Sequence, residues 1–68
     1  MGSTFVTVSE GRSVFIDNHR GIINFDDAMI VIRITTGKLI VSGASLTVRA
    51  IADRKIVIGG KIQSVEWE

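Results

Sequence analysis

Short apolar segments alternate with turn-forming residues along the whole chain. Within most segments, apolar and polar positions follow the two-residue period of a half-buried strand. Thr36-Gly37 is typical of the turns between them, because glycine supplies the positive φ that tight hairpins need. The pattern predicts an all-β fold, a small antiparallel β-sandwich or meander of about eight short strands with no helix. The expected strands are residues 5–8, 13–17, 21–25, 29–35, 38–41, 45–51, 55–58 and 61–67, with breaks at residues 42–44 and 59–60.

The alternation also predicts which face of each strand is buried. In residues 29–35, Ile30, Ile32 and Ile34 share one face, and the opposite face is also largely apolar. The same rule gives one face of residues 45–51 to Leu46, Val48 and Ala50.

The last segment breaks this rule in one place. Ile62 and Val65 are three positions apart, so they fall out of phase in a two-residue repeat. A β-bulge near Gln63 restores the phase and is therefore predicted there.

Strands that are apolar on both faces need a second sheet or a second chain to cover them. A chain of 68 residues buries only about 60% of the surface that its unfolded form exposes. Its core alone contributes roughly 3–5 kcal/mol of net stability. We therefore expect the protein to form a homodimer or a larger oligomer.

One domain at residues 5–68 is the expected organisation. Residues 1–4 are interpreted as a disordered start or a remnant of cloning, with the natural protein beginning further upstream. Residues 38–43 (KLIVSG) resemble residues 55–60 (KIVIGG). Two hairpins of similar length explain this likeness, and a short β-helix is the alternative, although two copies are fewer than a stable solenoid needs.

Composition supports strands and excludes several kinds of site. Isoleucine, valine and threonine make up 24 of the 68 residues, and branching at Cβ favours strands over helices. The chain has no cysteine, which excludes disulfides, thiolate zinc sites and cysteine nucleophiles, and its one histidine cannot build a histidine-rich metal centre. No cofactor or metal is expected. No apolar run is long enough to insert into a membrane.

The chain has eight basic side chains (Lys and Arg) and seven acidic ones (Asp and Glu), so its charge is nearly balanced. A nucleic-acid-binding domain normally has a clustered basic excess, so this balance speaks against nucleic acid as a partner. Arg33 and Arg49 would form a modest anion-binding surface if their strands were near neighbours. At least three of the four aromatic residues are expected in the core. Trp67 is a candidate anchor of the last strand or a candidate interface residue. Arg33 and Arg49 are also candidate interface residues.

Two clusters carry groups that could do chemistry. His19 lies in the predicted loop Asn18-His19-Arg20-Gly21, where it is either a general base beside an anion-binding arginine or a packed loop residue. Asp26-Asp27 is either a carboxylate pair for a cation or acid–base work, or a turn former. The structural interpretation is favoured for both.

The loop sequence resembles a known family. Residues 15–22 (FIDNHRGI) are similar to the "x-I-E-N-H-R/K-G-I" motif of the YabP/YqfC family of sporulation proteins, with Asp17 in place of the more usual glutamate. Later residues also match that family in register: Ile30, Ile32, Thr35, Gly37, Leu39, Val41, Gly43, Leu46, Val48, Ile58, Gly60, Ile62, Val65 and Trp67. The resemblance extends from Phe5 to Trp67.

This resemblance implies a non-enzymatic structural or adaptor protein of endospore formation. Its role would be in spore coat assembly or forespore-membrane morphogenesis, in the mother-cell cytoplasm, at the forespore membrane or in the coat. Its expected partners are a second copy of itself and an integral membrane sporulation protein. The family brings no catalytic residues, and Asn18, His19, Arg20 and Gly21 carry over as a structural or contact loop. The alternatives are a small β-barrel that binds nucleic acid, and an enzyme that uses either His19 with Arg20 or the Asp26-Asp27 pair.

Overall fold

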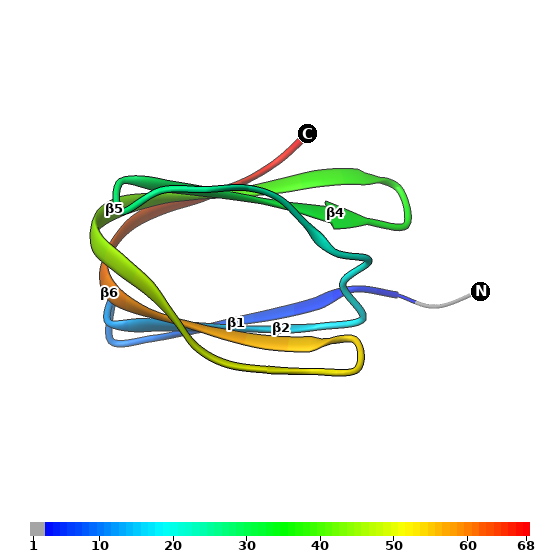
Figure 1. Cartoon of the computed structure of the whole chain (residues 1–68), viewed down its shortest axis with the longest axis horizontal. Coiled ribbons are helices and arrows are strands. Elements are labelled where there is room, and N and C mark those ends of the chain that lie inside the picture. Colours follow the sequence, from blue (N-terminus) through cyan, green and yellow to red (C-terminus); the bar gives the residue numbers. More distant parts are fainter. Residues whose placement is uncertain (1–2) are drawn as a thin grey trace.

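The apolar segments form strands, as their alternation predicts. The computed structural model describes residues 3–68, and within that range the chain forms six strands and no helix (Figure 1). The strands are β1 (Phe5–Ser9), β2 (Ser13–Asp17), β3 (Ile22–Phe25), β4 (Met29–Ile34), β5 (Gly37–Ala52) and β6 (Lys55–Trp67). All neighbouring strands are antiparallel, in the sheet order β1-β2-β6-β5-β4-β3. The predicted all-β antiparallel class is confirmed.

Met1 and Gly2, which belong to the predicted disordered start, lie outside the described residues. Ser3 and Thr4 lead directly into β1. From residue 3 to residue 68, no helix is long and apolar enough to cross a membrane.

The predicted number of strands is wrong. The expected strands at residues 38–41 and 45–51 are one strand, β5, and those at 55–58 and 61–67 are one strand, β6. Glycine-containing segments at residues 42–44 and 59–60 bend these strands without ending them, because glycine accepts close approach and unusual φ values while its backbone stays in the ladder. The antiparallel pairing throughout residues 3–68 also rules out the β-helix alternative.

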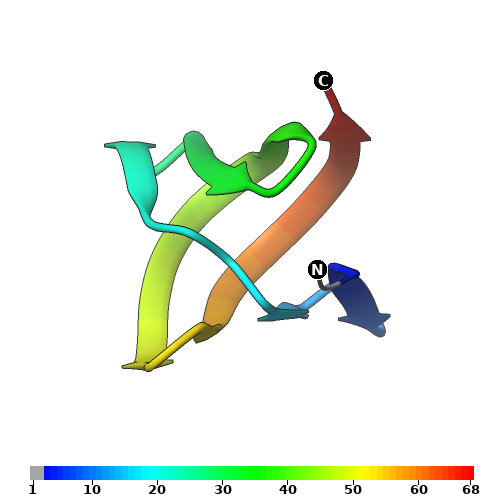
Figure 2. The ribbon, with the colours of Figure 1, turned by 90° about the vertical axis from the view of Figure 1, so that its right-hand side faces the viewer.

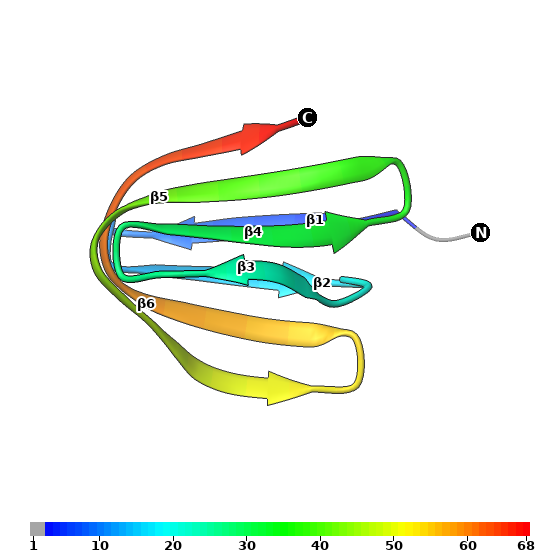
Figure 3. The ribbon, with the colours of Figure 1, turned by 45° about the horizontal axis from the view of Figure 1, so that its top comes forward.

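Bending turns one sheet into two layers. A straight strand of 16 residues would be roughly 50 Å long, whereas the longest dimension of the molecule is 32 Å. β5 and β6 therefore curve together from one layer to the other (Figure 3). The upper layer in Figure 1 contains β3, β4, residues 37–42 of β5 and residues 61–67 of β6, and the lower layer contains β1, β2 and the remaining halves of β5 and β6.

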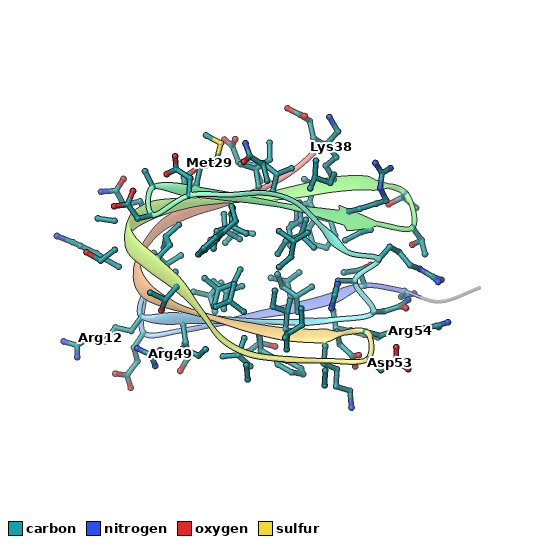
Figure 4. All side chains as sticks on the ribbon, in the orientation of Figure 1. Arg12, Met29, Lys38, Arg49, Asp53 and Arg54 are labelled. Atoms are coloured by element: carbon teal, nitrogen blue, oxygen red, sulfur yellow. The ribbon has the colours of Figure 1, made fainter. Side chains whose placement is uncertain are left out.

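The core fills the space between these layers (Figure 4). Its members are aliphatic and are at most 4% exposed: Val14, Ile16, Ile30, Ile32, Ile34, Leu39, Val41, Leu46, Ile56 and Ile58. The predicted burial of Ile30, Ile32 and Ile34 is confirmed. A fully buried side chain of this kind contributes about 1.5–3 kcal/mol, so these residues dominate the stability of the fold.

Bulges decide which side chains face the core. Ser64 pairs with Ser42 and Ile62 pairs with Gly43, which leaves Gln63 as the extra residue of the predicted bulge. A bulge that was not predicted occurs at Arg49, because Val48 pairs with Ile58 and Ala50 with Val57. This bulge reverses the phase of β5. Ala50 therefore faces outward and is exposed, contrary to the prediction.

The bend of β6 depends on Gly60. Its φ is +132°, and a Cβ atom at this position would lie 2.6 Å from the carbonyl oxygen of Ser45 in the adjacent bend of β5. We predict that Gly60→Ala lowers the free energy of unfolding by about 1–3 kcal/mol, through backbone strain and this collision. Chemical denaturation followed by far-UV circular dichroism measures the change.

Ser64→Ala is the matched control, because Ser64 is exposed on the same strand and its replacement should change stability by less than about 0.5 kcal/mol. Equal stability of the two variants would show that the bend tolerates a side chain at residue 60.

Candidate functional site

The loop at residues 18–21 connects the two layers at one end of the molecule. It leaves β2 in the lower layer and crosses to β3 in the upper layer (Figure 2). The backbone N–H groups of Asn18 and His19 donate to the carbonyl oxygen of Arg54, at 2.6 and 3.1 Å. At the other side, the N–H of Arg20 donates to the carbonyl of Arg33 at 2.7 Å, and the N–H of Arg33 donates to the carbonyl of Gly21 at 2.9 Å. The loop is therefore fastened to the β5–β6 turn below and to β4 above.

His19 is packed inside this loop and is only 7% exposed. Its Nδ1 atom accepts a hydrogen bond from the backbone N–H of Gly21 at 3.0 Å. A nitrogen that accepts a hydrogen bond carries no proton, so the proton of the neutral ring is on Nε2. Nε2 is buried and has no hydrogen-bond partner within residues 3–68. The Nδ1 atom of His19 thus holds the loop together through the Gly21 N–H, with the ring enclosed by the loop.

Asn18 and Arg20, two other residues of the loop motif, differ in their contacts. Asn18 has a positive φ of 75°, which asparagine tolerates better than most residues. Its Nδ2 atom donates to the carbonyl oxygen of Ser3 at 3.2 Å and so ties the start of the chain to the loop. The side chain of Arg20 is exposed. Within the motif, Asn18, His19 and Gly21 shape the loop, and Arg20 is the residue presented to solvent.

Three exposed arginines lie on adjacent segments at this end. Arg20 is in the loop, Arg33 is hydrogen-bonded to it through the backbone, and Arg54 is in the turn below. Figure 4 shows Arg54 projecting from this end, beside Asp53. The sequence pattern did not group these arginines, because they are distant along the chain and only the loop brings their segments together.

The structure does not bring Arg33 and Arg49 together. Arg33 faces outward from β4 in the upper layer, because its neighbours Ile32 and Ile34 are buried. Arg49 lies on the outer side of the lower layer (Figure 4). The Arg49 side chain covers Gly59, where a Cβ atom would collide with it. These two arginines therefore do not form one anion-binding surface.

The Asp26-Asp27 pair forms a turn. The Oδ1 atom of Asp26 accepts a hydrogen bond from the N–H of Ala28 at 2.6 Å, and the N–H of Asp26 donates to the carbonyl of Met29 at 3.0 Å. The carbonyl of Asp27 accepts from the N–H of Leu46 at 2.9 Å. Asp26 is thus a turn former, the structural interpretation given to this pair from the sequence.

The prediction that most aromatic residues lie in the core is wrong. Phe5, Phe15, Phe25 and Trp67 are 64%, 37%, 54% and 56% exposed. The narrow space between the layers is filled by isoleucine, valine and leucine, which leaves no interior position for a ring. Phe5 and Phe15 lie on the outer face of the lower layer, because their neighbours Val6 and Ile16 face inward.

Several other exposed apolar residues point inward but lie on edge strands. Two sides of the molecule, which we call flanks, are visible in Figure 2. At the β1 flank, β1 of the lower layer faces the end of β6 in the upper layer, and Val8 and Trp67 are 47% and 56% exposed there. At the β3 flank, β3 faces the second half of β5, and the corresponding residues are Ile22, Phe25 and Ile51, which are 37%, 54% and 58% exposed.

The pairing register shows why these residues face inward. Val8 is opposite Val14, Trp67 is opposite Leu39, and both partners are fully buried. Cross-strand partners lie on the same side of a sheet, so Val8 and Trp67 continue the rows of the core up to the edge. Sequence patterns give the face of a strand but not its place in the sheet, so these exposed positions could not be found from the alternation.

The chain is similar to known proteins along nearly its whole length. Residues 2–68 match the model of the YabP family. A protein of Bacillus subtilis (strain 168), named "Uncharacterized protein YqfC", is 30% identical over 62 residues, which is 91% of this chain and 67% of that protein. No solved structure matches the chain significantly.

The packing of His19 leads to a test of the loop. We predict that His19→Ala lowers the free energy of unfolding by about 2–4 kcal/mol, since it removes a buried ring and the acceptor of the Gly21 N–H. In a domain of this size the melting temperature would fall by at least about 8 °C. Thermal unfolding followed by circular dichroism measures this shift.

Arg20→Ala is the matched control, because its exposed side chain is adjacent in the same loop. Its melting temperature should stay within a few degrees of the parent protein. If His19→Ala were as stable as Arg20→Ala, His19 would have no structural role and a chemical one would be favoured.

Proposed function

The chain belongs to the YabP family, and we propose that it is a non-enzymatic structural protein of endospore formation that acts by self-association and by binding a partner. The family match covers nearly the whole chain, including the loop motif at residues 18–21. The sequence resemblance associates this family with the spore coat and with the membrane around the forespore. The proposed location is therefore the mother cell, either at the forespore membrane or in the coat.

The observation that carries the proposal is the row of core positions left open at the two flanks. Val8 and Trp67 at one flank, and Ile22, Phe25 and Ile51 at the other, are inward-facing apolar residues that remain about 37–58% exposed. Edge strands with exposed apolar side chains are templates for pairing with another chain. A small core gains stability when such a flank is covered.

The arrangement of His19 supports a structural role over an enzymatic one. Its Nδ1 atom is engaged by the Gly21 N–H, and the ring is buried in the loop. The loop's hydrogen bonds to Arg54 and Arg33 make it a fastening between layers. We also propose a structural, non-catalytic role for Asp26, whose carboxylate caps the turn before β4.

The arginines around the loop provide a surface for a partner. Arg20, Arg33 and Arg54 are exposed on adjacent segments. Guanidinium groups form strong, often bidentate hydrogen bonds with carboxylates. The proposed partner is an integral membrane sporulation protein with an acidic segment exposed to the mother cell.

Nucleic-acid binding is a second candidate function. The same three arginines, together with the exposed rings of Phe5 and Phe15, are residue types that bind phosphate groups and stack on bases. The near balance of charge over the chain weakens this candidate. A gel-shift titration with single-stranded DNA, in which affinity falls steeply as salt is raised, would favour it over the structural role.

Self-association has a direct test. We predict that sedimentation equilibrium at tens of micromolar protein gives a mass that is a multiple of the 7.4 kDa chain. The flanks bury their apolar side chains only when a second chain covers them, which is the physical reason for association. A mass of one chain at every concentration would contradict the proposal.

The proposed location has a separate test. A fluorescent fusion of the chain produced in the mother cell of sporulating Bacillus subtilis should collect around the forespore. An Arg20→Glu, Arg54→Glu variant should stay diffuse if the arginine surface holds the partner, and Arg12→Glu, at the far end of the molecule, is the charge control (Figure 4). Diffuse fluorescence of the parent fusion throughout sporulation would contradict the proposed location.

A further inference from the structure

The four exposed strand edges of the described chain differ in how well they are protected. The edges are formed by β1, β3, the second half of β5 and the second half of β6. Bulges interrupt three of them, at Ile23, Arg49 and Gln63. Bulges and charges keep an edge from pairing with other chains. Among these edges, β1 alone has no bulge, and its five residues, FVTVS, carry no charge.

We propose that β1 pairs antiparallel with β1 of a second copy about a two-fold axis at Thr7. This inference rests on the self-association in the proposed function and assigns it to one strand. The occupant of the edge is a second copy, because the sequence of β1 is nearly symmetric about Thr7, with Val6 and Val8 on its two sides. A two-fold axis requires such self-complementarity.

The register follows from the geometry of antiparallel pairs. An axis normal to the sheet pairs residue 7 with itself, and it places Val6 opposite Val8 and Phe5 opposite Ser9 of the second copy. Centring the axis on Thr7 pairs all five residues, while any shift leaves some of them unpaired. It also keeps the inward-facing valines together, so that the row Ile16, Val6 continues into Val8 and Val14 of the second copy.

Pairing at β1 also covers the open flank. An axis normal to the lower layer leaves the upper layers of both copies on the same side. The end of β6 in one copy then faces the end of β6 in the other, and Trp67 from each copy closes the shared interior at the β1 flank.

The area available sets the strength of this contact. Phe5, Val8 and Trp67 are 64%, 47% and 56% exposed. With about 150–250 Å² for each aromatic side chain, these residues contribute at most on the order of 300 Å² per copy, because Phe5 lies on the outer face beside Ser9 of the second copy and is covered only in part. Two copies with their backbones would bury on the order of 1,000 Å², at the lower end of specific interfaces. The dimer is therefore expected to form at micromolar concentrations and to dissociate on dilution.

Disulfide trapping tests the register, because the chain has no cysteine of its own. Thr7→Cys should form a covalent dimer on mild oxidation, since the two copies of residue 7 are directly opposite each other. Ser9→Cys is the control, because in the proposed register its two copies are separated by four residues along the strands, roughly 13 Å. Non-reducing electrophoresis distinguishes them.

A charge variant and the single tryptophan test the same contact without cross-linking. Thr7→Lys should be monomeric by sedimentation, and Thr47→Lys, the same exposed change on the second half of β5, should still dimerise. The emission of Trp67, the one tryptophan in the chain, should shift to shorter wavelength as the parent protein is concentrated, and should not shift for Thr7→Lys.

The outcomes separate this inference from the proposed function. If the parent protein is oligomeric while Thr7→Cys does not cross-link and Thr7→Lys still associates, the β1 contact is wrong and self-association stands. If Ser9→Cys cross-links as well as Thr7→Cys, the register is wrong. If the parent protein is a monomer at all concentrations, both self-association and the β1 contact are overturned.

Discussion

The structure depends on burying one face of a single sheet that no helix within residues 3–68 covers. The sheet meets this constraint by bending across its two longest strands, β5 and β6, until one face becomes the interior. Ten aliphatic side chains then lie in contact between the layers. The outer face and the two open flanks belong to the same sheet, so the apolar residues exposed there are a consequence of forming the core by bending.

Much of the fold could be predicted from the sequence, and the failures have identifiable causes. Alternation gave the buried face of β4 and the bulge at Gln63, because both depend only on neighbouring residues. It did not show that β5 and β6 are continuous, since a glycine that bends a strand has the same local pattern as one that ends it. The bulge at Arg49 and the exposure of the four aromatic residues depend on sheet order and on the width of the interior, which local patterns do not contain.

The loop motif could be found in the sequence, but the contacts that its residues make could be seen only in the structure. Asn18 adopts a positive φ, and the backbone N–H of Gly21 donates a hydrogen bond to the buried Nδ1 atom of His19. Together they let the chain cross between layers while its backbone groups remain hydrogen-bonded to Arg54 and Arg33. The motif that contains the chain's one histidine therefore forms the crossing between the two layers at one end of the sheet.

The sharing of β5 and β6 between the layers has a consequence for folding. Each layer contains half of both long strands, so neither layer is a separate unit of chain that could be stable while the other is unfolded. Loss of the bend would expose both inner faces at once. The molecule should therefore unfold as a single cooperative unit, and amide protons in β2 and β4, although they lie on opposite sides of the core, should exchange with solvent through the same global opening.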